Sequence, residues 1–392
     1  MERATSTMTS RLGSAAGGIL IVFVDGVGLG PNAPGNPFAD RSFDGLRALA
    51  GGPLVTGGGR VAPGLVFAEV DATLGVEGLP QSGTGQTTLF TGVNAARAIG
   101  RHVPALPGPR LKAIIEAEGL FAKACAAGYR VAFANAFAPG YLQGLSTGER
   151  RASVTVHLAQ CAGVPLLSEA ELLRGEAVTW ELERDLYRRV VGEHVPPITA
   201  ATAGLHLARI APRYDLTLYE TFLTDLAGHG RVPVSVLEAI ERVDAFVGGL
   251  VRTLPERVTL VLCSDHGNVE EPQHGRHTRN PVPLVARGPL ADRFAGLRSI
   301  EELTPAVLRA LGAGRAEEAP APQGGGRRQA APLRPDDATA LAGGGRRQAA
   351  PLLPEPETAA PAAGRRQAPL GPGHAVAGGA RAVAAVGASR NA

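Results

Sequence analysis

VTLVLCSDHGNVE, residues 258–270, joins a run of aliphatic residues directly to an acid and a histidine. An apolar run without polar alternation is typical of a strand that is buried on both faces of a parallel sheet. The arrangement occurs twice more, because Asp25 follows the run ILIVFV and Asp225 follows LTLYETFLT. Ligands of open parallel sheets bind beyond the carboxyl ends of the strands, so these side chains are expected to meet at one site.

A fourth aliphatic run lies at residues 130–134, and helical patterns separate the four runs. The predicted helices span residues 110–127, 169–174, 180–191, 234–253 and 300–311. Strands that alternate with helices predict an α/β fold. We expect a three-layer sandwich in which helices flank both faces of a mostly parallel central sheet.

Composition divides the chain into three parts. Residues 1–17 are small and polar, and we interpret them as a flexible N-terminal arm. Residues 18–314 are expected to fold as one domain, with a small helical lid within residues 145–207. Beyond them Gly, Pro, Ala and Arg dominate, and GGGRRQAAPL at residues 324–333 recurs at 343–352. Large apolar side chains are rare there, so residues 315–392 are predicted to be a disordered, low-complexity tail.

The composition also limits partners and compartment. A net charge of +3 over 392 residues, with acids and bases interspersed in the body, gives no reason to expect specific nucleic-acid binding. Cys125, Cys161 and Cys263 form no CxxC pair and no disulfide framework, which favours a reducing, cytoplasmic setting. The apolar run at residues 19–24 is too short to span a bilayer, so no membrane partner is expected. The oligomeric state is left open.

Acidic and imidazole side chains follow the predicted strands, and these are the ligand types that divalent Mn or Zn requires. Asp265 and His266 end the first stretch, and in TDLAGH His229 comes four residues after Asp225. On a helical turn, that spacing puts both side chains on one face. His277 in RHTRNPVPL adds another imidazole, and His274 competes with it. Each residue alone also fits a structural role, such as a turn cap.

LPQSGTGQTTLFTG, residues 79–92, supplies hydroxyl groups among glycines that let the backbone approach a phosphate at the start of a helix. It lacks the lysine of a Walker A loop. GVGLG at residues 26–30 is followed by PNAPG rather than by a helix, which argues against a dinucleotide-binding fingerprint. We interpret it as a turn that positions Asp25.

Taken together, these residues resemble the alkaline phosphatase superfamily, and within it the branch of cofactor-independent phosphoglycerate mutase and phosphopentomutase. The resemblance spans residues 19–312 in the same motif order, which implies that residues 18–314 form a metalloenzyme catalytic domain. SDHGNVE and HTRNPVP are similar to the DHGN and HTxNPVP signatures of that branch, and TDLAGH is similar to its PDMxGH stretch. SGTGQ is similar to the SEVGH of the mutases, and TLFTG to the TLVTG of nucleotide pyrophosphatases. Both alignments select Ser82 as the nucleophile.

The resemblance implies a phosphoryl-transfer enzyme with two divalent metal ions, Mn²⁺ favoured over Zn²⁺, that acts on a small phosphorylated substrate. The implied ligands are Asp25, Ser82, Asp265 and His266 for one metal ion, and Asp225, His229 and His277 for the other. Ser82 would form a phosphoserine. Thr84, Gln86 and Arg101 are the candidate substrate contacts, and Gln86 stands where the mutases have histidine.

Mutases of this branch resemble one another in carrying a large cap domain between the nucleophile and the second metal motif. Here residues 83–224 lie in that place and include a predicted strand and helices, which leaves room for only a small lid. A site open to water favours hydrolysis, so a phosphatase or phosphodiesterase-like hydrolase is expected. The alternatives are a compact phosphomutase of the phosphoglycerate or phosphopentose type, and a non-catalytic metal-binding or interaction module.

Overall fold

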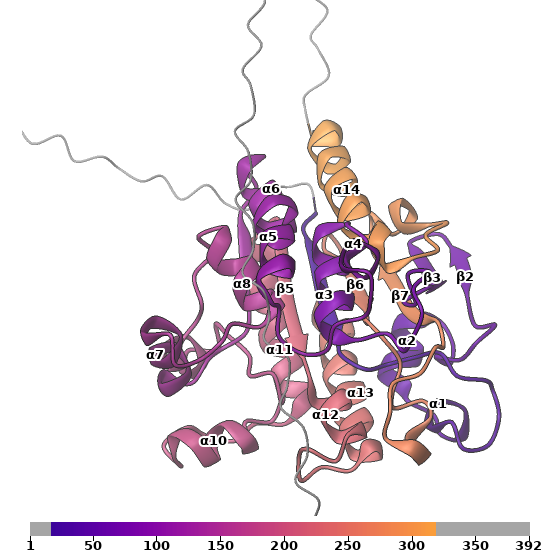
Figure 1. Cartoon of the computed structure of the whole chain (residues 1–392), viewed down its shortest axis with the longest axis horizontal. Coiled ribbons are helices and arrows are strands. Elements are labelled where there is room, and N and C mark those ends of the chain that lie inside the picture. The colour runs from indigo at the N-terminus through magenta and orange to yellow at the C-terminus, as the bar shows by residue number, and fades with distance from the viewer. Residues whose placement is uncertain (1–16, 319–392) are drawn as a thin grey trace, which may run out of the picture. The chain divides into compact units, whose positions relative to one another are not determined.

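A computed structural model describes residues 17–318 (Figure 1). The predicted N-terminal arm and the predicted tail lie outside the described residues, apart from Gly17 and residues 315–318. Within this range no helix is long and apolar enough to cross a membrane.

Seven strands of the described range form one central sheet in the order β2-β3-β7-β6-β1-β5-β4. Their bounds are β1 Ile19–Val24, β2 Arg60–Ala62, β3 Leu65–Val70, β4 Val131–Phe133, β5 Leu216–Thr221, β6 Thr259–Cys263 and β7 Val282–Arg287. The neighbours β4, β5, β1 and β6 pair in parallel, whereas β7, β3 and β2 add antiparallel pairings at the other edge. β7 returns antiparallel because residues 264–281 form no crossover helix between it and β6.

The strands predicted from the aliphatic runs are confirmed as β1, β4, β5 and β6. Sequence patterns did not reveal the other three strands, for physical reasons. β2 is three residues long and largely exposed, β3 mixes buried and half-buried positions, and β7 contains Pro283.

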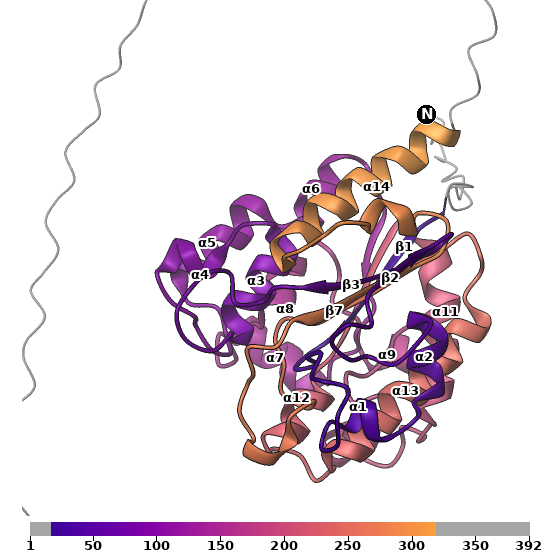
Figure 2. The ribbon, with the colours of Figure 1, turned by 90° about the vertical axis from the view of Figure 1, so that its right-hand side faces the viewer.

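Helices cover both faces of the sheet, which confirms the α/β sandwich (Figure 2). One layer contains α3 Ser82–Thr91, α5 Pro109–Glu118, α8 Val154–Cys161 and α14 Leu303–Glu318, and the other contains α2 Asp44–Ala50, α11 Ala200–Ile210 and α13 Val236–Thr253. Alternate residues of β1 enter the two hydrophobic cores: Ile19 and Phe23 face the first layer, and Leu20 and Val24 face the second. The aliphatic run ILIVFV of β1 contains no polar residue because both faces of the strand are buried.

Three predicted helices differ in their limits. The pattern at residues 110–127 forms two helices, α5 and α6 Leu120–Ala126, which are separated at Gly119. The pattern at residues 180–191 is helical only as α10 Asp185–Val191, because Leu182 and Arg184 have positive φ values. The final helix, α14, continues past Gly312 to Glu318.

Residues 145–207 distribute over several parts of the fold. α8 packs in the first layer, and α11 packs against α13 in the second. Helices α9 Glu169–Leu173 and α10 lie between them in the chain, and a small separate core holds this part together. That core consists of Ala136, Leu172, Ala177, Tyr187 and Val195. A lid function of this segment stays a prediction.

The remaining helices are short. They are α1 Pro37–Asp40, α4 Ala95–Ile99, α7 Pro139–Thr147 and α12 Leu223–Gly228. α12 directly follows β5, so its residues lie at the carboxyl end of the sheet.

Close packing of α11 on α13 generates a stability prediction. A Cβ atom added to Gly204 would lie 2.2 Å from the carbonyl oxygen of Phe246, whereas one added to Gly312 in α14 would meet no atom within 4 Å. Gly204→Ala should therefore lower the free energy of unfolding by about 1–3 kcal/mol. Gly312→Ala should raise it by up to about 1 kcal/mol through helix propensity. Urea unfolding followed by circular dichroism measures both, and equal midpoints would contradict the close packing.

Candidate metal centre

Side chains from separate segments meet at the carboxyl ends of β1, β5 and β6. Asp25 directly follows β1, Asp225 lies in α12, and Asp265 and His266 directly follow β6. Ser82 is the first residue of α3, and the remaining imidazoles are His229 at the end of α12 and His277 in the connection to β7. All seven side chains that the motifs single out are brought together, although they come from positions 25 to 277 of the chain.

The first ligand group surrounds His266. Its Nε2 atom lies 3.3 Å from Asp25 Oδ1 and 3.5 Å from Asp265 Oδ2, and all three side chains are buried. The same Nε2 atom lies 3.0 Å from Ser82 Oγ. Two carboxylates, one imidazole and one hydroxyl thus share a small volume at the start of α3.

The second ligand group joins two imidazoles to one carboxylate. The Nε2 atoms of His229 and His277 are 2.9 Å apart and lie 3.3 Å and 3.4 Å from Asp225 Oδ1. His229 Nδ1 lies 3.0 Å from the carbonyl oxygen of Gly275, and His277 Nδ1 lies 2.8 Å from that of Pro80. Since a carbonyl oxygen only accepts, both Nδ1 atoms donate a proton. In neutral rings the two Nε2 lone pairs therefore point toward each other and toward Asp225.

Such a convergence of lone pairs requires a positive charge. A proton can supply it at low pH: burial lowers the pKa of His277, but the hydrogen bond to Asp225 and the charge of Asp225 outweigh burial and raise it. A divalent cation meets the same requirement. Metal-bound imidazoles usually donate their other ring N–H to a carboxylate or a backbone carbonyl, as both rings do here. The second group therefore has the donor set and the tautomers of a metal site.

Unpartnered polar atoms in the first group also fit a cation. Asp25 Oδ1 and Asp265 Oδ1 are buried and make no hydrogen bond to the described residues. Burial and the charge of Asp265 raise the pKa of Asp25 well above its ordinary value. Burial and the charge of Asp225 raise the pKa of Asp265 to about 7, and burial lowers the pKa of His266 to about 3. A divalent cation would offset the burial of these carboxylates.

Two further residues of the SDHGNVE stretch, Asn268 and Glu270, hold this arrangement, and no motif assigned them a role. Asn268 donates from Nδ2 to Asp225 Oδ1 at 2.8 Å. Glu270 Oε2 accepts the backbone N–H groups of Gly28 and Asn268, at 2.9 Å and 2.8 Å. Glu270 Oε1 accepts the hydroxyl of Thr278 and the Asn280 amide. This buried carboxylate joins the turn after β1, the turn after β6 and the segment that carries His277.

The glycines of GVGLG permit these contacts. Gly26 has φ +76°, and an added Cβ would lie 2.8 Å from Asp225 Cβ. A Cβ on Gly28 would lie 2.1 Å from Glu270 Oε1. The structure agrees with the interpretation of this stretch as a turn that positions Asp25.

The remaining candidate residues occupy different environments. Gln86 is buried, and its Nε2 atom donates to Asp25 Oδ2 at 3.0 Å and lies 3.4 Å from Asp265 Oδ2. Thr84 is fully buried, and its hydroxyl donates to the carbonyl of Gln81 and accepts the N–H of Val103. Arg101 is exposed. His274 is exposed and pairs with Glu271 at 3.3 Å, so His277 is the imidazole that joins the second group.

A cavity of about 580 Å³ opens over Ser82. Polar residues of both ligand groups line one part of it. The rest of the lining is mainly apolar and includes Leu79, Leu106, Trp180, Phe222 and Leu226. Two exposed arginines, Arg231 and Arg276, complete the lining, and neither has an ion-pair partner within residues 17–318.

Comparisons with known proteins agree with this geometry. Residues 198–312 match the model of the Metalloenzyme superfamily. The 2,3-bisphosphoglycerate-independent phosphoglycerate mutase of Syntrophotalea carbinolica is 32% identical over 148 residues, which are 35% of this chain and 26% of that protein. The corresponding mutase of Moorella thermoacetica is 34% identical over 110 residues, 25% of this chain and 21% of that protein. The matches thus span about a quarter of the length of these relatives.

Among solved structures, the PH0037 protein from Pyrococcus horikoshii aligns with a TM-score of 0.47 at 15% identity, over 76% of this chain and 97% of that one. The alkaline phosphatase from the Antarctic bacterium TAB5 aligns with a TM-score of 0.42 at 11% identity, over 75% and 97%. The superfamily match contains Asp225, His229, Asp265, His266 and His277. Residues 198–312, which carry five of the seven candidate ligands, are thus similar to the Metalloenzyme superfamily, and the relatives named above are phosphoglycerate mutases, in agreement with the motifs.

Proposed function

We propose that this enzyme is a metal-dependent phosphoric ester hydrolase that acts through a phosphoserine on Ser82. The observation that carries the proposal is the position of Ser82 Oγ, 3.0 Å from His266 Nε2, at the border between two ligand groups and an open cavity. Ser82 is half-buried and begins α3, so its hydroxyl lies at the positive end of a helix dipole. N–H groups at a helix start favour phosphoryl oxygens.

The two ligand groups would hold two divalent cations. Asp25, Asp265 and His266 would bind the first, with Ser82, and Asp225, His229 and His277 would bind the second. When bound, the cations would lower the pKa of the Ser82 hydroxyl and offset the charge on the phosphoryl oxygens. Carboxylate oxygens form much of the donor set, which is the basis for proposing Mn²⁺ rather than Zn²⁺.

Two displacements would complete the reaction. Ser82 Oγ forms a bond to phosphorus as the bond to the leaving alcohol breaks. Water then attacks phosphorus, the Ser82 ester bond breaks, and inorganic phosphate leaves. Gln86 Nε2 would keep Asp25 and Asp265 oriented during both steps, since it donates to the first and lies near the second.

The size of the segment that follows Ser82 favours transfer of the phosphoryl group to water over its return to the substrate. Within residues 83–224, β4 and the helices α3, α5, α8 and α11 belong to the sheet and its two layers. Mainly α7 and the segment of α9 and α10 with the small core around Tyr187 remain outside them. That leaves little chain to exclude water from Ser82. The named relatives are phosphoglycerate mutases, so a compact phosphomutase is the alternative.

The cavity lining also supports a substrate class. Trp180 and Phe222 form a tilted pair with ring centroids 6.4 Å apart, and three leucines extend this apolar lining. Arg231 and Arg276 add cationic groups that suit phosphate oxygens. We propose a small phosphate ester whose alcohol is aromatic or otherwise apolar.

Replacing the nucleophile tests the reaction. Ser82→Ala should lower kcat toward aryl phosphates by on the order of 10³-fold or more, because no other group can carry the phosphoryl intermediate. The matched control is Ser146→Ala, which changes an exposed serine of α7 and should keep full activity. Inorganic phosphate release measures the rate. Full activity of Ser82→Ala would refute the phosphoserine, whereas substrate isomerisation without phosphate release would favour the mutase.

Metal binding should strengthen as pH rises. The raised pKa values of Asp25 and Asp265 keep both carboxyls protonated in the metal-free protein at acidic pH, and a cation must displace these protons. Because the folded-state pKa of Asp265, about 7, exceeds its unfolded value, its stabilising effect on the metal-free fold is lost as pH rises through 7. The Mn²⁺-induced increase in Tm should therefore be larger at about pH 8 than at about pH 5.5. An increase that is equal or larger at the acidic pH would contradict the assignment, and Asp265→Asn should flatten the dependence.

Removing the indole ring of Trp180 from the cavity lining tests the substrate class. Trp180→Ala should raise KM for an aryl phosphate by about 10-fold, because one buried aromatic contact contributes roughly 1–2 kcal/mol. KM for glycerol phosphate should change by less than about 2-fold. Trp180→Phe is the conservative control and should retain most of the affinity. Equal effects on both substrates would show that Trp180 shapes the site without recognising the alcohol.

A further inference from the structure

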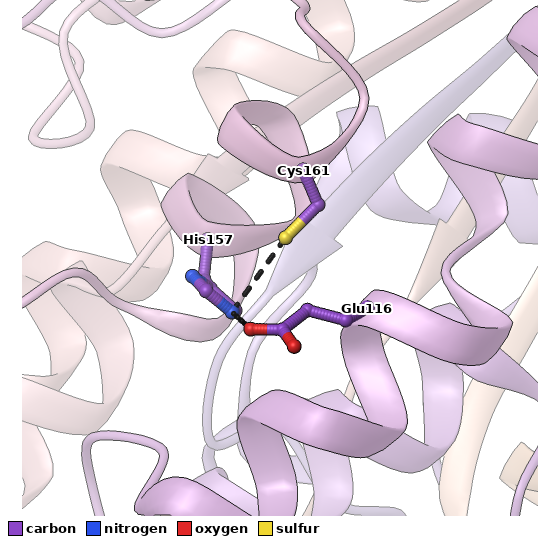
Figure 3. A group of neighbouring side chains, drawn as sticks. All are labelled: Glu116, His157 and Cys161. Atoms are coloured by element: carbon purple, nitrogen blue, oxygen red, sulfur yellow. Dashed lines mark hydrogen bonds and ion pairs between the residues drawn. The ribbon is translucent and has the colours of Figure 1, made fainter.

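Glu116, His157 and Cys161 form another group of potential metal ligands, which shares no residue with the candidate metal centre (Figure 3). His157 and Cys161 are four residues apart on α8, so both lie on one face of that helix. Glu116 comes from α5, which packs against α8. Figure 3 shows the carboxylate and the thiol both directed at the same ring nitrogen of His157. We propose that these three side chains bind a thiophilic divalent cation of the Zn²⁺ type.

The distances agree with a tetrahedral ion. Bond lengths of about 2.3 Å to sulfur and about 2.0–2.1 Å to nitrogen or oxygen put a sulfur and a nitrogen ligand about 3.6 Å apart, and a nitrogen and an oxygen ligand about 3.4 Å apart. Cys161 Sγ lies 3.6 Å from His157 Nε2, and Glu116 Oε1 lies 3.1 Å from it. All three donor atoms lie within 4.8 Å of one another. Only small side-chain movements are needed to bind an ion.

The donor set selects the metal. One thiolate, one imidazole and one carboxylate match Zn²⁺ or Co²⁺ and disfavour Mn²⁺ and Mg²⁺, which prefer oxygen ligands. A cation of charge +2 would balance the thiolate and the Glu116 carboxylate. Three protein ligands leave a fourth position for water, and Glu116 and Cys161 are exposed, so an ion can enter from solvent.

A cation here would act on the layer that carries Ser82. α3 packs against both α5 and α8, and α5 packs against α8. Linking Glu116 to His157 and Cys161 would fix these two helices to each other beside α3. The inference does not depend on the proposed hydrolase activity, since it rests on different residues and a different kind of ligand.

Cobalt titration of the full-length chain tests the proposal. Co²⁺ bound to a thiolate gives a sulfur-to-metal charge-transfer band, and the candidate metal centre contributes none because its ligands are oxygen and nitrogen. We expect a band that saturates at one thiolate-bound ion per chain and disappears in Cys161→Ser. Cys125→Ser removes a thiol outside the group and should keep the band. Absence of the band at saturating Co²⁺, or its persistence in Cys161→Ser, would refute the site.

A second measurement separates a metal site from a surface ion pair between Glu116 and His157. Zn²⁺ should slow the reaction of Cys161 with a thiol reagent by at least about 10-fold in the wild-type chain. His157→Ala should abolish this protection, and Glu116→Gln should weaken it, while the metal-free rates stay similar. Protection that is unchanged in His157→Ala would show that Zn²⁺ binds the thiol alone and would overturn the three-residue site.

Discussion

Two buried carboxylates, Asp25 and Asp265, lie side by side at the carboxyl end of the sheet, and the ion-pair partner of both in residues 17–318 is the imidazole of His266. Because burial lowers the pKa of that imidazole, it supplies little positive charge near neutral pH. Burying carboxylates without a compensating cation costs several kcal/mol, so they must bind either protons or metal ions. The remainder of the site is organised around this requirement.

The support for these carboxylates comes from the backbone as much as from side chains. β1, β5 and β6 are buried on both faces, and they set the positions of the carboxylates that follow them in the chain, Asp25, Asp225 and Asp265. Glu270 then binds backbone N–H groups of two turns and side chains of the segment that leads to β7. A rigid sheet and one buried carboxylate thus hold ligands that are up to 252 positions apart, from Asp25 to His277.

Sequence patterns predicted the parts of the fold whose burial is uniform. Strands buried on both faces give continuous aliphatic runs, and ligands placed after them are recognisable by residue type, so Asp25, Asp225 and Asp265 could be found without a structure. The hairpin of β2 and β3 gave no such signal because its burial is mixed. Glu270 could not be predicted because it accepts hydrogen bonds from backbone N–H groups, which no side-chain pattern marks. The contact between Glu116 and His157 depends on the packing of two helices and joins residues 41 positions apart, so no local pattern encodes it.

The two ligand groups at the sheet and the group on α5 and α8 differ in chemistry, and the difference affects how metal dependence is interpreted. Carboxylate and imidazole donors in the candidate metal centre accept Mn²⁺ readily, whereas a thiolate discriminates strongly in favour of Zn²⁺. An effect of Zn²⁺ on the whole protein could therefore arise at Cys161 rather than beside Ser82. Since α3 packs against both α5 and α8, occupancy of the proposed site of Glu116, His157 and Cys161 can change the stability of the layer that carries Ser82 without any change in the ions proposed at the candidate metal centre. Metal content per residue group, rather than total metal per chain, is then the quantity to compare with the proposed phosphoryl transfer.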